Sequence, residues 1–446
     1  MSLDPARTVF VILSFEGPDV YSQVGGLGVR VTGLSRALAM MGYPTYLYFC
    51  GDPQLPGEEE LEGGKLRLRR WCQWISAQHP GGVYDGEEGK IRDWNYSLPA
   101  SLVESVIVPA VAEDKYVIVL GEEWHTSWSM RLISDSLYYR GIRDRVVMLW
   151  NANNTFGFNR IEWAPLNLAS TVTTVSRYMK YRMWDWGQNP IVIPNGIPRE
   201  SIGNPDPQAV AEVRSAAGAE HFWFKIGRFD PDKRWLMAVA AAAELKRRGR
   251  SVKLLMRGGR EPHGNEVIGL ATNAGLAVRN VAAPPDAARL ASVLRESAEA
   301  DVINVTSFIE ESLVRVIYAS ADAVLANSGH EPFGLVGLEV MAAGGIAVTG
   351  STGEDYAEAY RNALVLETDD PLEIVTELSL LKEKPRVAEH VRKRGRITAR
   401  EYVWEKVIDQ LILRVDFAAE KQAVKPPQSG PARRRISRTR TLRSLT

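Results

Sequence analysis

Two glutamates late in the chain are spaced so that both could act on one bound ligand. Glu331 and Glu339 lie in the stretch 328–344, which reads SGHEPFGLVGLEVMAAG. The pattern predicts a buried strand at 323–326 and, after a turn, a helix at 334–343. Glu339 then leans toward the start of an otherwise apolar helix. Because a carboxylate among apolar residues needs hydrogen-bond donors, we expect it to bind a ribose diol; a structural glutamate is the alternative.

The predicted helix start between these glutamates offers an anion site. The backbone N–H groups of Gly334, Leu335 and Val336 have no partner within the helix, and such groups stabilise negative charge. Glu331 faces the same space from the turn that precedes the helix. We therefore expect an anionic ligand at this point of the chain.

A basic pair forms the second candidate group. Arg228 is predicted at the end of a strand, and Lys233 at the start of the following helix. Cations at a helix start oppose the helix dipole, so their position needs a reason. A bound diphosphate is one reason, and pairing with Asp230 and Asp232 is the other. Together with the helix start at Gly334, the two cations could neutralise a nucleoside diphosphate leaving group.

A glycine-rich loop marks the beginning of the chain. Residues 21–28 (YSQVGGLG) lie between a predicted buried strand at 8–15 and a predicted helix at 29–41. The loop begins too far from its strand for the tight turn of a dinucleotide-binding fingerprint. We expect the backbone at Gly25 and Gly26 to approach a substrate phosphate or sugar instead, with a flexible connection as the alternative.

The elements that position these groups alternate between strand and helix, which predicts parallel sheets. The pattern pauses near 184–190, and a second series begins with a strand at 191–193. Region 53–93 is expected to be a hairpin or a long insertion. Ligand-binding groups should follow the carboxyl ends of the strands. Residues that meet this condition in the first series are Glu16, Glu123, His125 and Asn151, although His125 could equally be structural.

Composition is that of an ordinary globular chain, with 45% hydrophobic and 24% charged residues and no net charge. Only two cysteines are present, Cys50 and Cys72, too few for a disulfide framework or a metal cluster. We see no signal peptide or membrane span and expect a cytoplasmic protein without integral membrane contact. From 421 onward there are eight Lys or Arg and no acidic residue. This tail could touch anionic surfaces, but without interleaved aromatics it does not predict nucleic-acid binding.

At these motifs the chain resembles the retaining GT-B glycosyltransferases. EPFGLVGLE resembles their signature, KIGRFDPDK is similar to their G-R-x-x-x-x-K group, and VSRYM, IPNGI and REYVWEKV also match. The segments VGGLGVRVTGLSRALAMMG and EEWHT are similar to the glycogen and starch synthase branch and, more loosely, to glycosyltransferase family 4. The resemblance covers most of residues 8–417.

The resemblance implies an α/β protein of two Rossmann-like parallel-sheet domains facing across a cleft. Residues 1–186 would form the acceptor-side domain, 187–398 the nucleotide-sugar donor domain, 399–417 a helix returning to the first domain and 418–446 a basic disordered tail. It implies retaining transfer of a hexosyl group, expected to be glucosyl, from a nucleotide-diphosphate sugar to a saccharide or small hydroxyl compound. Neither metal nor cofactor is required in the family.

The resemblance also implies roles for the candidate residues. The expected catalytic residues are Glu331, Arg228 and Lys233. Donor binding is expected from Gly25, Gly26, Gly334, Leu335, Val336 and Glu339. The sugar and acceptor cleft is expected to contain Glu123, His125 and Asn151.

This sequence departs from the family pattern at three places. The family has His before the asparagine that is Asn151 here, so that contact passes to Asn151 or His125. The synthase branch has Lys where Gln23-Val24 stands, and a later Gly-Gly reads Gly353-Glu354. Two other functions therefore stay open at this point: a nucleotide-sugar epimerase, and a sugar or nucleotide sensor without catalysis.

Overall fold

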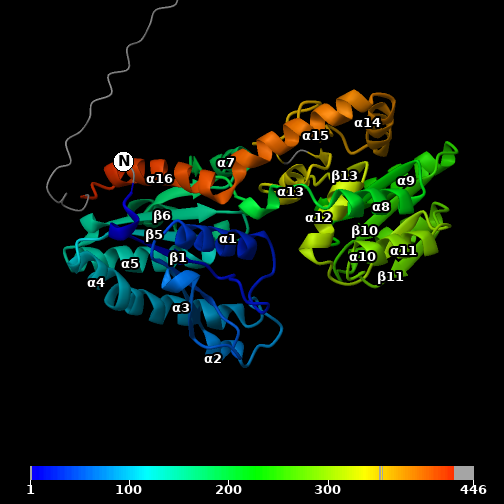
Figure 1. Ribbon diagram of the computed structural model, residues 1–446. Coiled ribbons are helices and arrows are strands. Elements are labelled where there is room, and N and C mark those ends of the chain that lie inside the picture. The colour runs from blue at the N-terminus through cyan, green and yellow to red at the C-terminus, as the bar shows by residue number, and fades with distance from the viewer. Residues whose placement is uncertain (1–2, 351–352, 354, 426–446) are drawn as a thin grey trace, which may run out of the picture.

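Two lobes, each built on one sheet, make up this computed structural model, which describes residues 3–350, 353 and 355–425 (Figure 1). The first sheet has the strand order β3-β4-β2-β1-β5-β6-β7-β8, and the second the order β11-β12-β10-β9-β13-β14-β15. All pairings are parallel except that of β3 with β4. The first-sheet strands are β1 (Thr8–Leu13), β2 (Thr45–Cys50), β3 (Glu58–Leu61), β4 (Leu66–Trp71), β5 (Tyr116–Glu122), β6 (Val146–Ala152), β7 (Thr171–Thr174) and β8 (Ile191–Val192).

Helices cover both faces of this first sheet, as expected for parallel strands that are apolar on both sides. Every residue of β1 and of β5 is buried. A π-helical turn, Val103–Ile107, joins α3 to α4. The helices of the first lobe are α1 (Gly26–Met40), α2 (Gln73–Ser76), α3 (Glu87–Leu102), α4 (Val108–Ala112), α5 (Ser127–Tyr139), α6 (Trp163–Ala169) and α7 (Arg177–Trp184).

The second lobe repeats this architecture. Its strands are β9 (His221–Ile226), β10 (Val252–Arg257), β11 (Val278–Val281), β12 (Val302–Val305), β13 (Ala323–Ala326), β14 (Ala347–Thr349) and β15 (Leu364–Val365). Its helices are α8 (Pro207–Ala217), α9 (Trp235–Arg247), α10 (His263–Asn273), α11 (Ala287–Glu296), α12 (Glu311–Ser320), α13 (Leu335–Ala343), α14 (Pro371–Glu383) and α15 (Pro385–Ala399).

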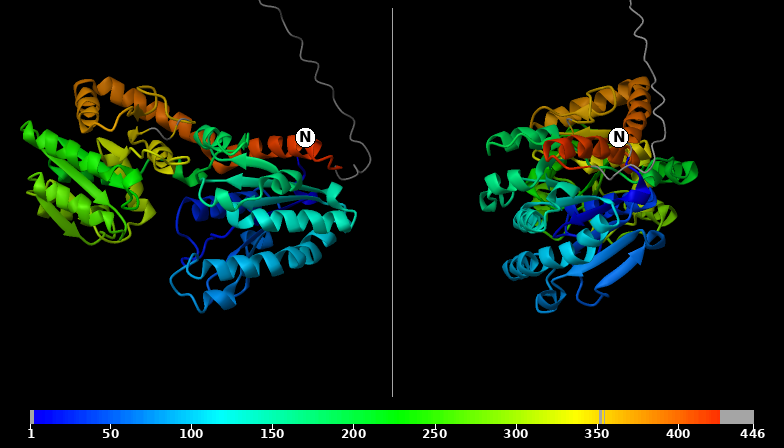
Figure 2. Two further views of the ribbon diagram at one scale, coloured as in Figure 1. Left: turned by 180° about the vertical axis from the view of Figure 1, so that it is seen from behind. Right: turned by 90° about the vertical axis from the view of Figure 1, so that its left-hand side faces the viewer.

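The last helix, α16 (Trp404–Lys421), returns to the first lobe, which confirms the predicted crossover (Figure 2). The indole of Trp404 packs where Gly33 and Gly196 have no side chains: an added Cβ would lie 2.3 Å and 2.5 Å from its atoms. Beyond the helix, the Gln422 amide donates to the Met148 carbonyl at 2.8 Å. Through these contacts, the end of the described chain packs against the first lobe and is hydrogen-bonded to β6 of its sheet.

Three expectations about the elements are corrected. The strand at 191–193 was expected to open the second series, but β8 pairs with β7 and ends the first sheet. Region 53–93, expected to be a hairpin or a long insertion, contains the hairpin β3–β4 but also the beginning of α3 at Glu87. The last helix continues to Lys421 because Ala418 and Ala419 are buried against the first lobe, so 418–421 are not part of a tail.

Two sequence predictions fall outside the described residues: those for 426–446 and for Glu354. Among the helices that are described, none has both the length and the apolar character needed to cross a membrane.

Candidate functional site

The carboxyl ends of two neighbouring strands bring Lys233 and Glu331 together. β9 and β13 pair in the second sheet, and each residue lies in the loop that follows its strand. The Lys233 ammonium lies 2.6 Å from Oε1 of Glu331, and the two side chains are 23% and 24% exposed. Two groups predicted separately from sequence therefore share one site.

This ion pair argues against one of the two explanations offered for Lys233, which is pairing with the nearby aspartates. Asp230 accepts a hydrogen bond from the backbone N–H of Asp232 at 2.9 Å and caps its own turn. Asp232 lies 3.8 Å from the imidazole of His330. Neither aspartate neutralises Lys233, so the alternative of local pairing is wrong for this residue.

Arg228 is anchored through its backbone and not through its side chain. Its carbonyl accepts a hydrogen bond from the indole of buried Trp235 at 2.7 Å. The residue is exposed, and within the described part of the chain its guanidinium has no hydrogen-bond or ion-pair partner. The neighbouring Gly227 lies against the Lys233 side chain, 4.0 Å from the position of an added Cβ. An exposed guanidinium without a described partner, in the same loop as Lys233, is suited to bind an anion.

The start of α13 keeps its amides free while the turn before it is fixed. Gly334 has φ +81°, a left-handed conformation that favours glycine. Its carbonyl accepts a hydrogen bond from the Tyr356 hydroxyl. No side chain caps the helix, and the amides of Gly334, Leu335 and Val336 bond to none of the described residues. The structure thus shows free amides at the predicted helix start, and anion binding by them stays a prediction.

Glu339 lies half-buried on α13, as predicted. Burial raises the pKa of its carboxyl to about 7, although a hydrogen bond donated by the Tyr318 hydroxyl at 3.3 Å opposes that rise. The negative charge of Glu331 contributes to the same rise, so the two carboxylates interact electrostatically. One hydrogen bond leaves the Glu339 carboxylate with capacity for further donors, as a ribose diol would supply.

Lys225 is a residue of this site that the sequence analysis missed. It is buried in β9, and its ammonium donates to the Leu325 carbonyl at 3.0 Å and to Oδ1 of Asn327 at 2.6 Å. Burial lowers its pKa well below the usual value, and the charge of Lys233 acts in the same direction. Lys225 ties β9 to the loop that leads to Glu331. A lone lysine in the apolar run HFWFKI was the available signal.

In the first lobe, Glu16 organises the glycine-rich loop. Oε2 of Glu16 accepts the backbone N–H groups of Val24, Gly25 and Gly28 at 3.2, 3.1 and 3.0 Å. The hydroxyl of Tyr84 donates to its other oxygen at 2.7 Å. Glu16 therefore follows β1, as predicted, but acts on the loop that leads into α1.

The two predicted glycines of this loop face open space. Gly25 precedes α1, and Gly26 is its first residue. A Cβ added to either glycine would meet nothing within 4 Å, whereas one on Gly28 would lie 3.1 Å from Glu16 and Gln23. The fold requires a small residue at Gly28 but not at the two predicted positions. Close approach of a ligand to the backbone would explain why Gly25 and Gly26 are glycines.

His125 is buried, and its ring is held by one carboxylate and two aromatic neighbours, while its Nδ1 has no hydrogen-bond partner among the described residues. Its Nε2 lies 2.8 Å from the Glu87 carboxylate, and its ring stacks on Phe15 and Trp124 with centroids 4.3 and 4.0 Å away. Burial lowers the pKa of the imidazole, so the ring favours its neutral form. These contacts are those of a structural histidine, the alternative that the sequence left open.

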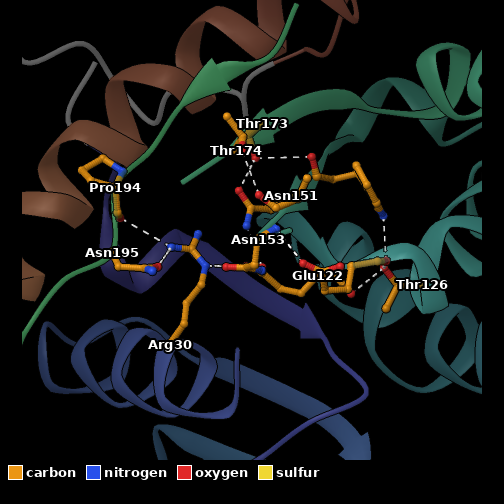
Figure 3. A network of polar contacts seen from close by, with 12 residues as sticks. Arg30, Glu122, Thr126, Asn151, Asn153, Thr173, Thr174, Pro194 and Asn195 are labelled. Carbon is orange, nitrogen blue, oxygen red and sulfur yellow. Dashed lines mark hydrogen bonds and ion pairs between the residues drawn. The ribbon is translucent and has the colours of Figure 1, made fainter. Parts of the chain in front are cut away.

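Asn151 belongs to a buried polar network under the carboxyl ends of the first sheet (Figure 3). Its amide donates to Glu122 at 2.8 Å and its oxygen accepts from the Thr173 hydroxyl at 2.9 Å. The guanidinium of Arg30 joins the same network at 3.1 Å from Glu122 and continues to Asn195 at 2.6 Å. Both ends of the Asn151 side chain are therefore engaged inside the lobe.

Glu123 lies beside this network in a rare backbone conformation. It has φ +67° and ψ 166°, a combination costly for any residue but glycine. One carboxylate oxygen accepts the backbone N–H groups of Asn153 and Asn154 at 2.6 and 3.1 Å. Burial is the main cause that raises the pKa of this carboxyl to about 8. The structure thus places Glu123 at the predicted strand end, buried and bonded to its own lobe.

Contacts between the lobes place the Glu331 turn next to the first sheet. The Ser176 hydroxyl, just after β7, donates to the Pro332 carbonyl. Arg177 pairs with Asp355 at 3.1 Å, and the Tyr402 hydroxyl donates to the Asp355 carbonyl at 2.5 Å. Residues of both lobes therefore border the turn that carries Glu331.

Comparison with known proteins finds one family model that matches part of the chain. Residues 211–398 match the family model described as glycosyl transferases group 1. None of the curated protein sequences matches significantly. In the part of the chain that the structure describes, no group of three or more His, Cys, Asp and Glu side chains is arranged to hold a metal ion.

Solved structures resemble the whole two-lobed chain. Sucrose-phosphate synthase from Thermosynechococcus elongatus is 20% identical, with a TM-score of 0.64 over 93% of this chain and 100% of that one. The catalytic domain of starch synthase IV from Arabidopsis thaliana, bound to ADP and acarbose, is 16% identical, with a TM-score of 0.66 over 92% and 99%. Anabaena Alr3699/HepE in complex with UDP-glucose is 15% identical, with a TM-score of 0.59 over 92% and 99%. This likeness confirms the predicted GT-B fold.

Proposed function

We propose that this chain transfers a glucosyl group from a nucleotide-diphosphate sugar to an acceptor hydroxyl, a proposal supported by the match of residues 211–398 to the glycosyl transferases group 1 model. The acceptor is a saccharide or a small hydroxyl compound, and the anomeric configuration is retained. The observation that carries the proposal is the Lys233–Glu331 pair beside the uncapped start of α13.

The donor diphosphate is held by the second lobe. Arg228 and Lys233 supply positive charge, and the free amides of Leu335 and Val336 supply hydrogen bonds along the helix dipole. Each charge-assisted hydrogen bond contributes about 1.5–3 kcal/mol. The half-buried carboxylate of Glu339 accepts the two ribose hydroxyls, which satisfies a group that is otherwise costly to bury.

Transfer takes place on one face of the sugar. The bond between the anomeric carbon and the phosphate oxygen breaks, and the nucleoside diphosphate leaves with the electron pair. The acceptor oxygen bonds to the anomeric carbon from the same side, and its proton passes to the leaving phosphate. Arg228 and Lys233 stabilise the charge that develops on the phosphate, and Glu331 accepts hydrogen bonds from the sugar hydroxyls.

The first lobe supplies the opposite wall. The open backbone at Gly25 and Gly26 approaches the donor or acceptor, held in place by Glu16. Behind this loop, hydrogen bonds within the first lobe hold the side chains of Glu123, His125 and Asn151. These residues support the wall without contacting the substrate. This assignment gives the three residues a positioning role and leaves direct contacts to the glycine loop.

A donor screen with product analysis tests the proposal. The protein is incubated with ADP-, UDP- and GDP-glucose and a mixture of saccharide acceptors, and nucleotide release and the anomeric coupling constant of the product are measured. We expect acceptor-dependent nucleotide release and an α-linked product from an α-linked donor. A β-linked product would refute retention. A donor epimer formed without acceptor would identify an epimerase, and folded protein that binds a donor without turning it over would contradict transfer.

A further inference from the structure

A second concave surface lies outside the proposed site, at the free edge of the first sheet. It is a groove of about 820 Å³ between α7, β8 and the second half of α16. β8 is the terminal strand of its sheet, so the backbone groups on its outer side have no neighbouring strand. Figure 1 shows α7 and α16 on this side of the first lobe. The groove has the size of a small-molecule site, and none of the donor-site residues of the second lobe lines it.

Two helices each turn one face toward this groove. Within each helix the lining residues lie three, four or seven positions from the first one, and residues at that spacing are neighbours on one side of a helix. Each face carries two cations and one aromatic ring: Arg177, Lys180 and Tyr181 on α7, and Arg414, Phe417 and Lys421 on α16. The groove therefore lies between two similar sets of side chains.

Three of these four cations lack a protein partner. The side chains of Lys180, Arg414 and Lys421 form neither an ion pair nor a hydrogen bond with any residue of the described chain. Arg177 pairs with Asp355 at 3.1 Å. Among the described residues, the lining includes no aspartate or glutamate, and the acidic residues of the same helix segments lie outside it: Asp185, Asp416 and Glu420. Unpaired cations in a concavity concentrate positive potential and attract anions.

The number of unpaired cations favours a phosphate monoester as the anion. Near neutral pH such a group carries a charge of about −1.5 to −2 and offers three acceptor oxygens. A carboxylate or a phosphodiester carries a single negative charge and would leave more of the positive charge uncompensated. The planar guanidinium of Arg414 can bind two phosphate oxygens at once, and the ammonium groups of Lys180 and Lys421 act as point charges. We therefore expect the phosphate to lie between these three side chains.

The rest of the lining suits an organic group attached to the phosphate. Tyr181 and Phe417 each expose about half of their surface, and an aromatic face packs against the apolar face of a sugar or base ring. Asn167 donates to the Gln188 side chain at 3.0 Å, which leaves the amide oxygen of Asn167 without a partner among the described residues. The amide nitrogen of Asn189 likewise has no partner in the described chain, because only its oxygen accepts a bond, from an indole at 3.4 Å. Both atoms are available to ligand hydroxyls.

We propose that this groove binds a small organic phosphate monoester, with its phosphate held by Lys180, Arg414 and Lys421 and its ring against Tyr181 and Phe417. A sugar phosphate and a nucleoside monophosphate share this chemistry, and the experiment below distinguishes them. The ligand would bridge α7 to α16, the helix that returns from the second lobe. This site is separate from the donor site and goes beyond the proposed transfer reaction.

Calorimetry on the full chain, with no donor present, tests the proposal. The probes are glucose 6-phosphate, AMP, glucose, adenosine and inorganic phosphate. We expect at least one of the two monoesters to bind with one molecule per chain, about tenfold or more tightly than inorganic phosphate. Glucose and adenosine should not bind at the same concentrations. The monoester that binds more tightly identifies the organic group as a sugar or a nucleoside.

Charge variants locate the phosphate. K180A/R414A/K421A removes the three unpaired cations and should weaken binding of the monoester by at least about tenfold. The control K384A/R386A/K393A removes three cations at exposed positions of the second lobe and should bind as the unaltered protein does. Circular dichroism confirms that both variants are folded.

Aromatic variants locate the organic group. Y181A/F417A should weaken binding of the monoester while leaving the affinity for inorganic phosphate unchanged. The control Y96A/Y139A removes two exposed tyrosines of the same lobe and should change neither affinity. An unchanged monoester affinity in Y181A/F417A would overturn the assignment of the ring to these two side chains.

The remaining outcomes decide whether the groove is the site. Binding of neither monoester would overturn the proposal, as would equal affinity in K180A/R414A/K421A and the unaltered protein. Equal affinity for the monoester and for inorganic phosphate would reduce the groove to a site for a bare anion and overturn it as well. Arg228→Ala should bind the monoester normally, and weaker binding there would place the ligand in the donor site. Donor turnover is measured separately, so failure of this proposal and failure of the proposed transfer function are distinguishable.

Discussion

The ammonium of Lys233 and the carboxylate of Glu331 lie 2.6 Å apart, although 98 positions separate them in the sequence. Each residue follows a strand of the second sheet, and those strands are neighbours. In the structure, Glu331 balances the charge of Lys233. A donor diphosphate would take over Lys233 and release Glu331 to accept hydrogen bonds from the sugar. Under the proposed function, the pair would couple phosphate binding to sugar binding.

Glu331→Gln separates these two effects. Removing the carboxylate removes a competitor of the phosphate for Lys233, and a partly exposed ion pair contributes about 1 kcal/mol, so affinity for the nucleoside diphosphate should rise by roughly fivefold. Turnover should fall by about a hundredfold because the sugar loses an acceptor. Calorimetry with the diphosphate and initial rates with the sugar donor measure the two. Weaker diphosphate binding together with normal turnover would contradict the coupling.

Glu339 predicts a pH dependence of donor binding. Its pKa is raised to about 7, so the carboxyl is neutral below that pH and ionised above it. An ionised carboxylate accepts ribose hydroxyls more strongly, so donor affinity should fall as the pH falls from 8 to 6, by up to about tenfold. Glu339→Gln should bind weakly at all pH values and lose this dependence. The donor KM is measured across the range. A pH profile of Glu339→Gln parallel to that of the unaltered protein would assign the dependence to another group.

Gly26 and Gly28 form a matched pair of substitutions to alanine. The added methyl of Gly26→Ala meets no protein atom within 4 Å, so stability should be unchanged or higher. Its activity should fall by about tenfold or more if the substrate approaches this backbone. Gly28→Ala brings a methyl to 3.1 Å from Glu16 and should instead destabilise the loop. Thermal unfolding and initial rates distinguish the two effects. Full activity in Gly26→Ala would indicate that the loop only connects β1 to α1 and does not contact the substrate.

Glu16 should act through the glycine loop. Glu16→Ala leaves three backbone amides without their partner and should cost about 1–3 kcal/mol of unfolding free energy and raise KM. Glu16→Gln keeps an acceptor oxygen and should restore most of both. Denaturant unfolding and KM are measured side by side. A KM for Glu16→Ala equal to that of the unaltered protein would limit Glu16 to a structural role.

The sequence predicts elements best where burial is complete. Strands β1 and β5 contain continuous apolar runs, and a run of that kind between turn residues has few other interpretations. The edge strand β11 reads VRNV and is partly exposed, so it left no comparable signal. β8 belongs to the first sheet because it pairs with β7. The residue pattern of a single strand contains no information about which strand it pairs with. The boundary between the two series was therefore placed one strand too early.

The sequence predicts which strand ends carry the polar residues of the candidate site. It does not predict the direction in which each side chain points. Arg228, Lys233 and Glu331 follow neighbouring strands, and the structure keeps them in adjacent loops. Glu123 and Asn151 also lie at strand ends, but their side chains bond within the first lobe. The direction of a side chain at a strand end depends on tertiary contacts that sequence spacing does not contain. Lys225 was missed for the same reason.

Titration of a nucleoside diphosphate into the protein tests whether Arg228, Lys233 and the start of α13 form a diphosphate site. Calorimetry with UDP and ADP is performed on the unaltered protein, on Arg228→Ala and on Arg386→Ala, an exposed arginine of α15 that serves as control. We expect binding by the unaltered protein and the control, and affinity reduced by about ten- to a hundredfold in Arg228→Ala, since one charge-assisted contact is lost. Equal affinity in all three proteins would contradict a diphosphate site at Arg228, Lys233 and the start of α13.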